Sequence, residues 1–253
     1  MNTINVTIKD RLALITLNRG KSNALNRELI TELSDMLHNI SNDDNINGVI
    51  ITGREHFFSA GLDLIELYGY NEEEAKSFWH LFLDFTAKII AFKKPMVAAI
   101  NGHSPAGGCV IALACDARVM AEGKYIIGLN EVPVGIIVPE SIFKLYSFWL
   151  GTGNAARSLL EGKLFSPEEA LEIGLVDELV NPDSIMTAAE RKIRKYMALE
   201  PNTWQQSKLN IRKELIEATS ADQAETLEAM LKQWWAPSTR GILKMIIDNL
   251  QKK

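Results

Sequence analysis

Apolar and polar residues alternate at the start of the chain. The segments "VTIKD" and "LALITLN" flank the charged pair Asp10-Arg11, a pattern that predicts a β-hairpin. Apolar residues then recur three and four positions apart over residues 27–40 and 72–91, which predicts two amphipathic helices. Three glutamates, Glu72–Glu74, open the second of these helices, where the helix dipole favours negative charge.

Short apolar runs lie between and beyond these helices. The runs at 47–53 and 95–100 predict buried strands, and a Pro/Gly turn and the small-residue helix "GGCVIALAC" follow the second strand. Further short strands are expected in "ARVMAE", "KYIIGL" and "LVDELV". Residues 54–70 show no clear period and predict a loop with a short helix.

The chain beyond Pro139 is predicted to be mainly helical. In "SPEEALEIG", Ser166 is the expected N-cap, Glu169 lies three residues after it, and Gly174 is the expected C-cap. Residues 184–251 predict three or four helices. Strands that alternate with helices, followed by helices alone, indicate an α/β core with a helical appendage.

Composition and charge exclude several classes of partner. The 253 residues are 47% hydrophobic and 23% charged, which is ordinary for a soluble globular protein. A net charge of −5 gives no positive field for nucleic acid, and no apolar run approaches the roughly 20 residues of a membrane span, so neither partner is expected. The N-terminus lacks the features of a signal or transit peptide, from which we expect a cytoplasmic location. Cys109 and Cys115 have neither metal-site nor disulfide spacing, so we expect buried thiols and no metal.

Two glycine-containing turns follow two of the predicted strands. In "FFSAGLDL", Gly61 allows the chain to direct the next amide, Leu62 N–H, into a cleft. In "NGHSPAGGCVIALACD", Ala106 to Gly108 open a helix whose first N–H groups have no partner within the helix. Backbone donors at such turns can form an oxyanion hole. Tight turns and close helix packing alone would also explain the glycines.

The stretch "IIGLNEVPVGIIVP" (126–139) has one ionisable residue, Glu131, among apolar neighbours. One interpretation is a surface carboxylate at the end of a strand. A buried Glu131 would instead have a raised pKa, which suits a general base working near neutral pH.

At these motifs the sequence resembles the crotonase (enoyl-CoA hydratase/isomerase) superfamily. "FFSAGLDL" is similar to its first oxyanion-hole motif, "AINGHSPAGGCVIALACDARV" to its second, and "YIIGLNEVPVGIIVP" to its catalytic-carboxylate segment. "LNRGKSNALNREL" and "LFSPEEALEIGLVDELV" fit the same family in the same order. The similarity extends over residues 4–200.

The resemblance implies a fold, a substrate and a set of site residues. The fold would be α/β, a crotonase-like spiral of ββα turns over residues 1–200, with a C-terminal helical oligomerisation region over 201–253 that forms a homotrimer or a dimer of trimers. The substrate would be an acyl-CoA thioester, with no separate cofactor because coenzyme A is part of the substrate. The thioester oxygen would lie between Leu62 N–H and Gly107 N–H. The implied substrate-binding residues are Lys21, Ala24, Ser59, Ala60, Gly61, Asp63, Val110 and Asn130.

The carboxylates distinguish the members of this family. Its hydratases use two glutamates, one of them three residues past the oxyanion-hole glycine, where this chain has Val110. A valine cannot hold or deprotonate a water, so ordinary hydration is disfavoured. A single carboxylate still supports a 1,3-proton shift, in which Glu131 removes a proton from C2 of a 3-enoyl-CoA and returns it at C4. The stretches "PAGGC" and "IGLNE…GIIVP" specifically resemble those of the mitochondrial type of Δ3,Δ2-enoyl-CoA isomerase of fatty-acid β-oxidation.

Other interpretations of the sequence stay open. The chain could be another crotonase-fold enzyme, such as a hydratase, a decarboxylase or a thioester hydrolase, since one fold hosts many reactions. A non-catalytic RNA binder is disfavoured by the net charge and by an intact Glu131. Glu66 is the candidate for a second acid, whereas Asp63 is expected to cap the next helix and His103 to be structural. Acyl chain length is expected to depend on segments such as 64–90 and 136–150.

Overall fold

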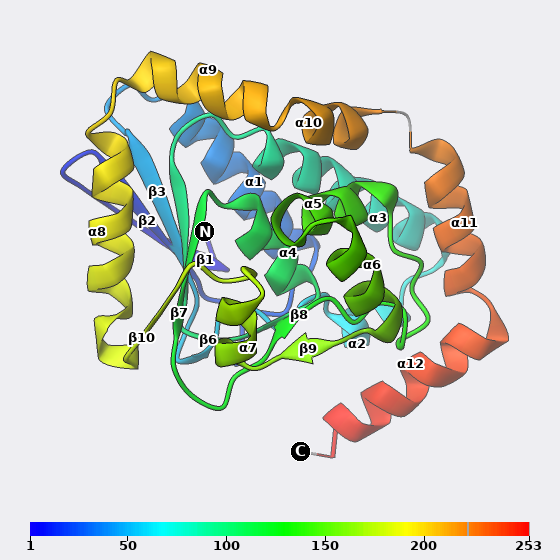
Figure 1. The fold of residues 1–253 in the computed structure, drawn as a ribbon. Coiled ribbons are helices and arrows are strands. Elements are labelled where there is room, and N and C mark those ends of the chain that lie inside the picture. The colour runs from blue at the N-terminus through cyan, green and yellow to red at the C-terminus, as the bar shows by residue number, and fades with distance from the viewer. Residues whose placement is uncertain (222, 253) are drawn as a thin grey trace.

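The computed structural model describes residues 1–221 and 223–252 and contains two β-sheets surrounded by helices (Figure 1). In the larger sheet the first two strands pair antiparallel as the predicted hairpin, and every other neighbouring pair is parallel. Its strands, in spatial order, are β1 (Ile4–Lys9), β2 (Leu12–Leu17), β3 (Gly48–Thr52), β5 (Met96–Ile100), β7 (Ala117–Ala121) and β10 (Glu178–Val180).

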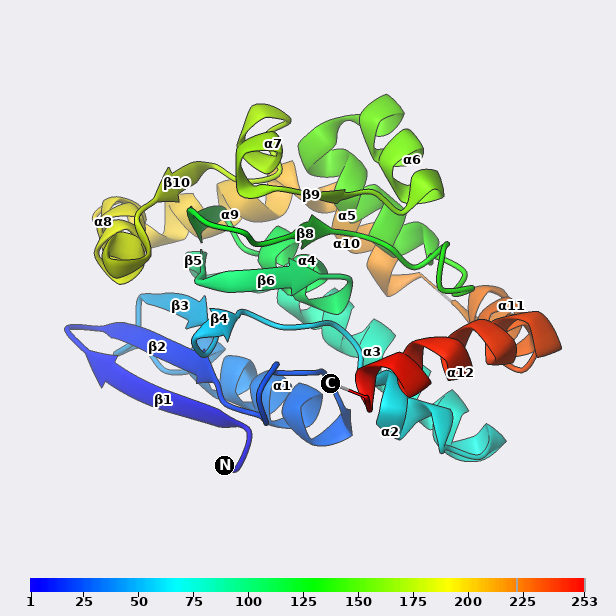
Figure 2. The same ribbon diagram turned by 90° about the horizontal axis from the view of Figure 1, so that it is seen from below.

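The smaller sheet is made of very short strands. In Figure 2 its strands lie one above another, and β8 and β9 form its antiparallel pair. In order they are β4 (His56–Phe57), β6 (Gly102–Pro105), β8 (Ile127–Gly128) and β9 (Leu164–Phe165). Three successive passes of the chain, which begin at β3, β5 and β7, each add one strand to the larger sheet, one strand to the smaller sheet and then helix. This repetition is the predicted spiral of ββα turns.

Helices cover both faces of the larger sheet. The helices before the C-terminal region are α1 (Arg27–Ser41), α2 (Leu64–Tyr68), α3 (Glu72–Ile90), α4 (Gly107–Ala114), α5 (Glu140–Leu150), α6 (Thr152–Glu161), α7 (Pro167–Glu172) and α8 (Ile185–Met197), with a 3-10 turn η1 at Pro182–Ser184. One face packs against α8, through a cluster that includes Val97, Val119 and Ile193. The other face packs against the helices that carry the main core.

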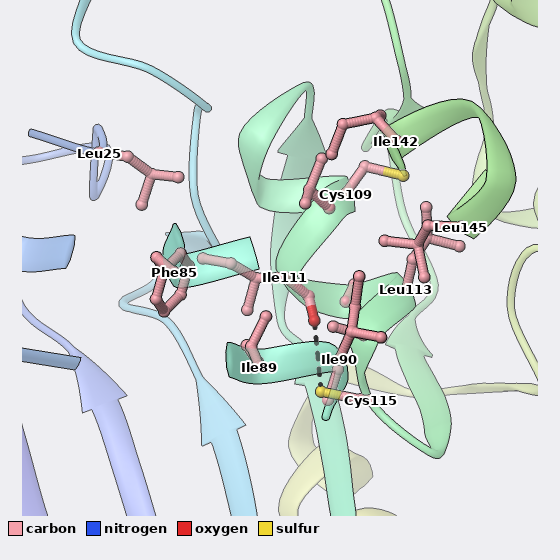
Figure 3. Close-up of a cluster of buried hydrophobic side chains, with 14 of the residues drawn as sticks. Leu25, Phe85, Ile89, Ile90, Cys109, Ile111, Leu113, Cys115, Ile142 and Leu145 are labelled. Carbon is pink, nitrogen blue, oxygen red and sulfur yellow. Dashed lines mark hydrogen bonds between the residues drawn. The ribbon is translucent and has the colours of Figure 1, made fainter. Parts of the chain in front are cut away.

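Helix α4 lies at the centre of that core. Every one of its residues is buried, and its side chains meet α3 on one side and α5 on the other (Figure 3). The figure also includes Cys109 and Cys115, both free thiols, and Cys115 Sγ donates to Ile111 O at 3.4 Å. The cysteines are therefore buried in an apolar environment, as predicted.

The C-terminal helices pack on the same chain. They are α9 (Pro201–Ile211), α10 (Lys213–Ser220), α11 (Ala224–Trp234) and α12 (Pro237–Leu250). Arg240 of α12 donates to Tyr68 O at 2.8 Å, and its guanidinium carbon lies 3.5 Å from the centre of the Tyr68 ring. Both the boundary at residue 200 and the oligomerisation role of 201–253 stay predictions. No helix within the described ranges is long and apolar enough to span a membrane.

The structure corrects the sequence interpretation in three places. The sequence does not predict β4, β6 or β9. β4 lies in the predicted loop 54–70, and "GHSP" of β6 indicates a turn, but pairing with β4 and β8 makes β6 a strand. The helices described between 184 and 251 number five, rather than three or four. The break between α11 and α12 falls at Ala236, just before a proline, and the residue before a proline disfavours helix. The break between α9 and α10 at Arg212 has no such signal in the sequence. At α7, Ile173 is the C-cap and Gly174 follows it at φ +76°.

Candidate active site

One cavity of about 110 Å³ brings together residues from four distant segments. They come from the turn after β4, from α3, from the N-terminus of α4, and from the segment after β8 that continues into α5. The lining residues are Ala60, Leu62, Leu64, Trp79, Phe82, Pro105, Ala106, Gly107, Val110, Asn130, Glu131, Val134, Ile136, Pro139 and Ile142. The lining is therefore almost entirely apolar around a single carboxylate.

The turn after β4 leaves one backbone donor free. Leu25 N–H donates to Gly61 O at 2.7 Å, and Asp63 N–H donates to Leu25 O at 2.9 Å. These two bonds form an isolated parallel bridge that uses the residues on either side of Leu62 but not the amide of Leu62 itself. Gly61 has φ +84°, which glycine adopts without strain, and it makes the bend between the two bonds. The two hydrogen bonds of the bridge do not use Leu62 N–H. This pattern is consistent with the prediction from the sequence that Leu62 N–H points into a cleft.

The second donor lies at the start of α4, against the first turn. A Cβ added at Gly61 would lie 3.1 Å from Gly107 N, and one added at Gly107 would lie 3.4 Å from Gly61 Cα. Gly107 is the first residue of the helix, so its amide has no partner within the helix. Within residues 1–221 and 223–252, neither the Leu62 amide nor the Gly107 amide donates to another protein atom. The two residues that carry these free N–H groups both line the same small cavity.

Backbone strain accompanies this arrangement at Ala106. The residue has φ +49° and ψ −123°, a combination that side-chain-bearing residues rarely adopt and that costs on the order of 1–3 kcal/mol. Its ψ angle sets the orientation of the peptide that carries Gly107 N–H. Ala106 N–H is itself fixed by donation to Gly128 O at 2.8 Å. The strained residue, Ala106, therefore directly precedes and orients the Gly107 amide.

Glu131 lies in a tight turn shortly after β8. Its backbone carbonyl accepts from Val134 N–H at 3.1 Å and from Ile136 N–H at 3.0 Å, which closes the turn. The residue as a whole is half-buried, but Oε2 is shut off from solvent and has no hydrogen-bond partner among the described residues. Burial raises the pKa of Glu131 to about 7, against a smaller lowering by its own backbone N–H. A carboxyl with this pKa can exchange a proton near neutrality.

Val110 lies one helical turn beyond Gly107 and faces the same cavity. It is 1% exposed. Among the described residues that line the cavity, Glu131 is the only ionisable one. The second candidate acid, Glu66, is instead paired outside it: its Oε2 is 3.0 Å from Arg19 Nη2 and its Oε1 accepts from the Tyr70 hydroxyl at 2.6 Å.

Six of the sequence-predicted site residues meet in the cavity, namely Ala60, Leu62, Gly107, Val110, Asn130 and Glu131. The roles assigned to them stay predictions. The remaining five, Lys21, Ala24, Ser59, Gly61 and Asp63, do not line it.

The structure gives reasons for these other positions. Ser59 is fully buried, and its hydroxyl donates to Asn23 O at 2.8 Å and accepts from Gly61 N–H at 3.2 Å. Asp63 caps α2 by accepting from Glu66 N–H at 3.0 Å, as predicted, and also pairs with Arg19 at 2.7 Å. Lys21 is exposed and Ala24 is half-buried beside the Gly61 turn.

His103 packs between aromatic rings outside the cavity. Its ring centroid lies 5.1 Å from that of Phe57 and 5.3 Å from that of Tyr125. Burial lowers its pKa. This placement agrees with the structural role expected for it.

The aromatic side of the cavity lies in segment 64–90, which was expected to affect acyl chain length, but the sequence did not single out its two residues. Trp79 and Phe82 reach it from α3, three positions apart on the buried face of the helix. The same spacing is typical of any core-facing helix, so no signal in the sequence separates these two residues from Phe78 or Phe85. In the described part of the chain, no cluster of three or more His, Cys, Asp or Glu side chains could hold a metal ion.

The geometry supports one kind of chemistry. Two free N–H groups can stabilise a negative oxygen, and one carboxyl with a pKa near 7 can take up and return a proton. An apolar lining strengthens both effects because it excludes water. Such a site suits proton transfer next to a carbonyl group.

Known proteins of this type resemble the chain along its length. The family model for enoyl-CoA hydratase/isomerase matches residues 7–243. Enoyl-CoA delta isomerase 1 of mouse mitochondria is 37% identical over 248 residues, which cover 96% of this chain and 84% of the relative; the human protein is 34% identical over 237 residues, 91% and 77% of the two chains. A short-chain-enoyl-CoA hydratase of Clostridium acetobutylicum is 32% identical over 79% of this chain and 77% of its own.

Solved structures agree with these relatives. The crystal structure of human mitochondrial Δ3-Δ2-enoyl-CoA isomerase superposes with a TM-score of 0.95 at 31% identity, covering 99% of this chain and 98% of the other. The similarity confirms both the predicted α/β crotonase fold and the assignment of the chain as an enzyme of the enoyl-CoA isomerase type.

The predicted cytoplasmic location is wrong. The delta isomerase relatives of mouse, rat and human are mitochondrial proteins. Targeting segments are separate from the folded enzyme, so the composition of the fold does not determine its compartment.

The family match and these relatives together show that the chain belongs to the enoyl-CoA hydratase/isomerase family.

Proposed function

We propose that the chain is a Δ3,Δ2-enoyl-CoA isomerase of fatty-acid β-oxidation, which converts a 3-enoyl-CoA to the trans-2-enoyl-CoA. The observation that carries this proposal is that Glu131 is the only ionisable side chain among the described residues lining the cavity that also contains Leu62 and Gly107. The relatives named delta isomerases support the same reaction.

The reaction moves one proton and one double bond. The ionised Glu131 takes the proton from C2, whose acidity the neighbouring thioester increases, and the electron pair passes into the thioester oxygen as a dienolate. The amides of Leu62 and Gly107 donate to that oxygen and stabilise its charge. The protonated Glu131 then gives the proton to C4, so that the double bond lies between C2 and C3. No atom is gained or lost.

The environment of Glu131 suits both steps. The buried Oε2 of Glu131 has no partner among the described residues, and burial raises the pKa of this carboxyl to about 7. Neither its charged nor its neutral form is therefore strongly favoured near neutral pH. Val110 and Ile136 keep the region around the dienolate apolar, which disfavours its quenching by water.

The remaining predicted residues belong to the rest of the substrate. In the proposed complex Asn130 and Ala60 contact the acyl thioester, because they line the cavity. Lys21, Ala24 and the Ser59–Asp63 loop lie outside it, and we assign them to the coenzyme A portion. The homotrimer or dimer of trimers is part of the same proposal, and light scattering of the purified chain tests it directly.

Hydration is the second candidate function. A hydratase relative at 32% identity favours it, whereas Val110 in place of a second carboxylate opposes it. The products distinguish the two reactions, because hydration adds a hydroxyl group and isomerisation leaves the mass unchanged.

The test is product analysis with purified protein and a 3-enoyl-CoA. We expect the conjugated 2-enoyl thioester with no added water. Glu131→Gln should lower kcat by about 10²–10⁴-fold, the range for loss of a general base. Glu140→Gln is the control, because Glu140 is exposed and pairs with Lys144 on the surface of α5. A Glu131→Gln variant with normal kcat, or a hydrated product as the main one, contradicts the proposal.

A further inference from the structure

Two aromatic side chains of α3, Trp79 and Phe82, form one side of the cavity, and Trp234 of α11 packs against Trp79; we call the three residues the aromatic wall. The ring centroids of Trp79 and Trp234 are 5.8 Å apart at an angle of 77°, and those of Trp79 and Phe82 are 6.1 Å apart at 83°. Edge-to-face contacts of this kind are favourable beyond simple area burial.

The wall is held in place from several sides. Phe78 makes a further edge contact with Trp79, with centroids 6.0 Å apart at 74°. The exposed fractions of Trp79 and Trp234 are 3% and 2%. Arg240 of α12 lies with its guanidinium carbon 6.0 Å from the Trp234 ring. Trp79 therefore cannot rotate out of the cavity unless Trp234, on a C-terminal helix, moves as well.

The space in front of the wall is small. The cavity measures about 110 Å³, whereas a cavity of about 150 Å³ in another protein holds one benzene molecule, that is, six carbons. Glu131, Leu62 and Gly107 line this same space, so in the proposed reaction the reacting carbons of the substrate occupy it as well. A short acyl chain fills it.

We infer that the aromatic wall restricts this enzyme to short 3-enoyl-CoA substrates, of about six carbons or fewer, with Trp79 and Phe82 as specificity-determining residues. Trp234 is a positioning residue that acts through Trp79. This inference rests on the proposed isomerase function and names the substrate class of that site.

A length limit has a clear thermodynamic signature. Each methylene that enters an apolar site strengthens binding about fourfold, and one that does not fit adds nothing or weakens binding. We expect the affinity to rise from four carbons to about six and then to level off or fall. Removing the indole of Trp79 should move this limit toward longer chains.

The experiment measures kcat/KM for 3-enoyl-CoAs of four to twelve carbons with the wild type, Trp79→Leu and Phe82→Leu. Saturated acyl-CoAs of the same lengths are titrated by calorimetry, which reports the length limit without any turnover. We expect wild-type preference for the short chains, and an increase of at least tenfold in the ratio of ten-carbon to six-carbon kcat/KM in Trp79→Leu. Trp234→Leu should shift the ratio in the same direction by a smaller factor.

Phe85→Leu is the matched control. Phe85 is a buried aromatic residue of the same helix, 1% exposed, and does not line the cavity. The Phe85→Leu substitution should leave the chain-length profile unchanged even if it lowers the stability of the protein. A wild-type profile that still rises beyond eight carbons, or one that Trp79→Leu and Phe82→Leu leave unchanged, overturns the inference. Absence of isomerisation at every length contradicts the proposed function instead, and the calorimetric length limit then still tests the wall.

Discussion

The hydroxyl of Thr239 donates to the backbone carbonyl of Gly135 at 3.0 Å, across 104 residues of sequence. Thr239 is fully buried in the first turn of α12, and its hydroxyl also accepts from Gln233 Nε2 at 2.8 Å. Gly135 has φ +81°, and a Cβ there would lie 2.8 Å from Thr239 Oγ1. It belongs to the turn that begins at Glu131. The last helix of the chain therefore fixes the turn that carries the proposed base.

Thr239→Val tests this link. The valine keeps the volume but leaves Gly135 O and Gln233 Nε2 without this partner, at a cost of about 1–3 kcal/mol in the free energy of unfolding. Because the Glu131 turn loses an anchor, we expect kcat to fall about tenfold with a smaller change in KM. Steady-state kinetics and urea denaturation measure the two effects.

Thr219→Val is the matched control for that substitution. Thr219 is also buried, and its hydroxyl donates to the Ile216 carbonyl at 3.0 Å, on a helix that supplies no residue to the cavity lining. It should lower stability but not kcat. Equal losses of kcat in the two variants would mean that Thr239 has only a structural role.

The activity should depend on pH through Glu131. The first step requires the ionised carboxylate, and burial places its pKa at about 7. We therefore expect kcat/KM to rise about tenfold per pH unit below that value and to level off above it. His103→Gln serves as control, because His103 is a titratable side chain whose pKa is lowered by burial. A profile that is flat from pH 5 to 8, or an inflection that His103→Gln abolishes, is incompatible with Glu131 as the base.

Stability should change with pH in the opposite direction. The folded-state pKa of Glu131, about 7, lies above its ordinary value of 4.5, so the folded protein holds this proton more tightly than the unfolded chain. The contribution to stability is complete below about pH 4.5 and is lost as the pH rises through about 7, with a total of at most about 3 kcal/mol. Glu131→Gln lacks this loss, so its stability relative to wild type should increase from pH 5 to 8. If the free energies of unfolding of the two proteins differ by the same amount at every pH, the Glu131 carboxylate is better solvated than this prediction requires.

Local sequence predicted the parts of the fold that depend on local chemistry. The hairpin around Asp10-Arg11, helix α3 and the cap at Ser166 all follow from spacing and capping residues, and the structure has them where they are expected. The very short strand β6 depends instead on neighbours that distant parts of the chain supply. Its sequence alone, "GHSP", contains no strand signal.

In the candidate site, too, local sequence predicts some features, whereas others depend on distant parts of the chain. Gly61, Gly107 and Glu131 could be named from the sequence, because glycine turns and an isolated carboxylate are unusual enough to attract attention. The strain at Ala106 and the aromatic wall could not, since an alanine before a glycine pair and a tryptophan on a buried helical face are unremarkable in sequence. Their importance arises only where α3, α4 and α11 converge.

A buried ionic cluster attaches the first C-terminal helices to the core. Asp116, between α4 and β7, accepts from Lys208 Nζ at 2.8 Å and lies 3.0 Å from Arg212 Nη2. Its Oδ2 also accepts from Met96 N–H at 2.8 Å. All three charged side chains are at most 8% exposed. Burial lowers the pKa of Lys208, with Asp116 acting in the opposite direction. One carboxylate thus pairs with two buried cations, and the other hydrogen bonds of these two cations go to backbone carbonyls.

Asp116→Asn should therefore destabilise the protein strongly. The substitution leaves two buried cations without their carboxylate, for which the expected loss is about 3–5 kcal/mol in the free energy of unfolding. The matched control is Asp84→Asn, because Asp84 pairs with Lys88 at 2.6 Å on the exposed surface of α3, where an ion pair contributes less than about 1 kcal/mol. Denaturant unfolding measures both losses. Similar small losses in the two variants would mean that water reaches the cluster and that α9 and α10 are held mainly by apolar contacts.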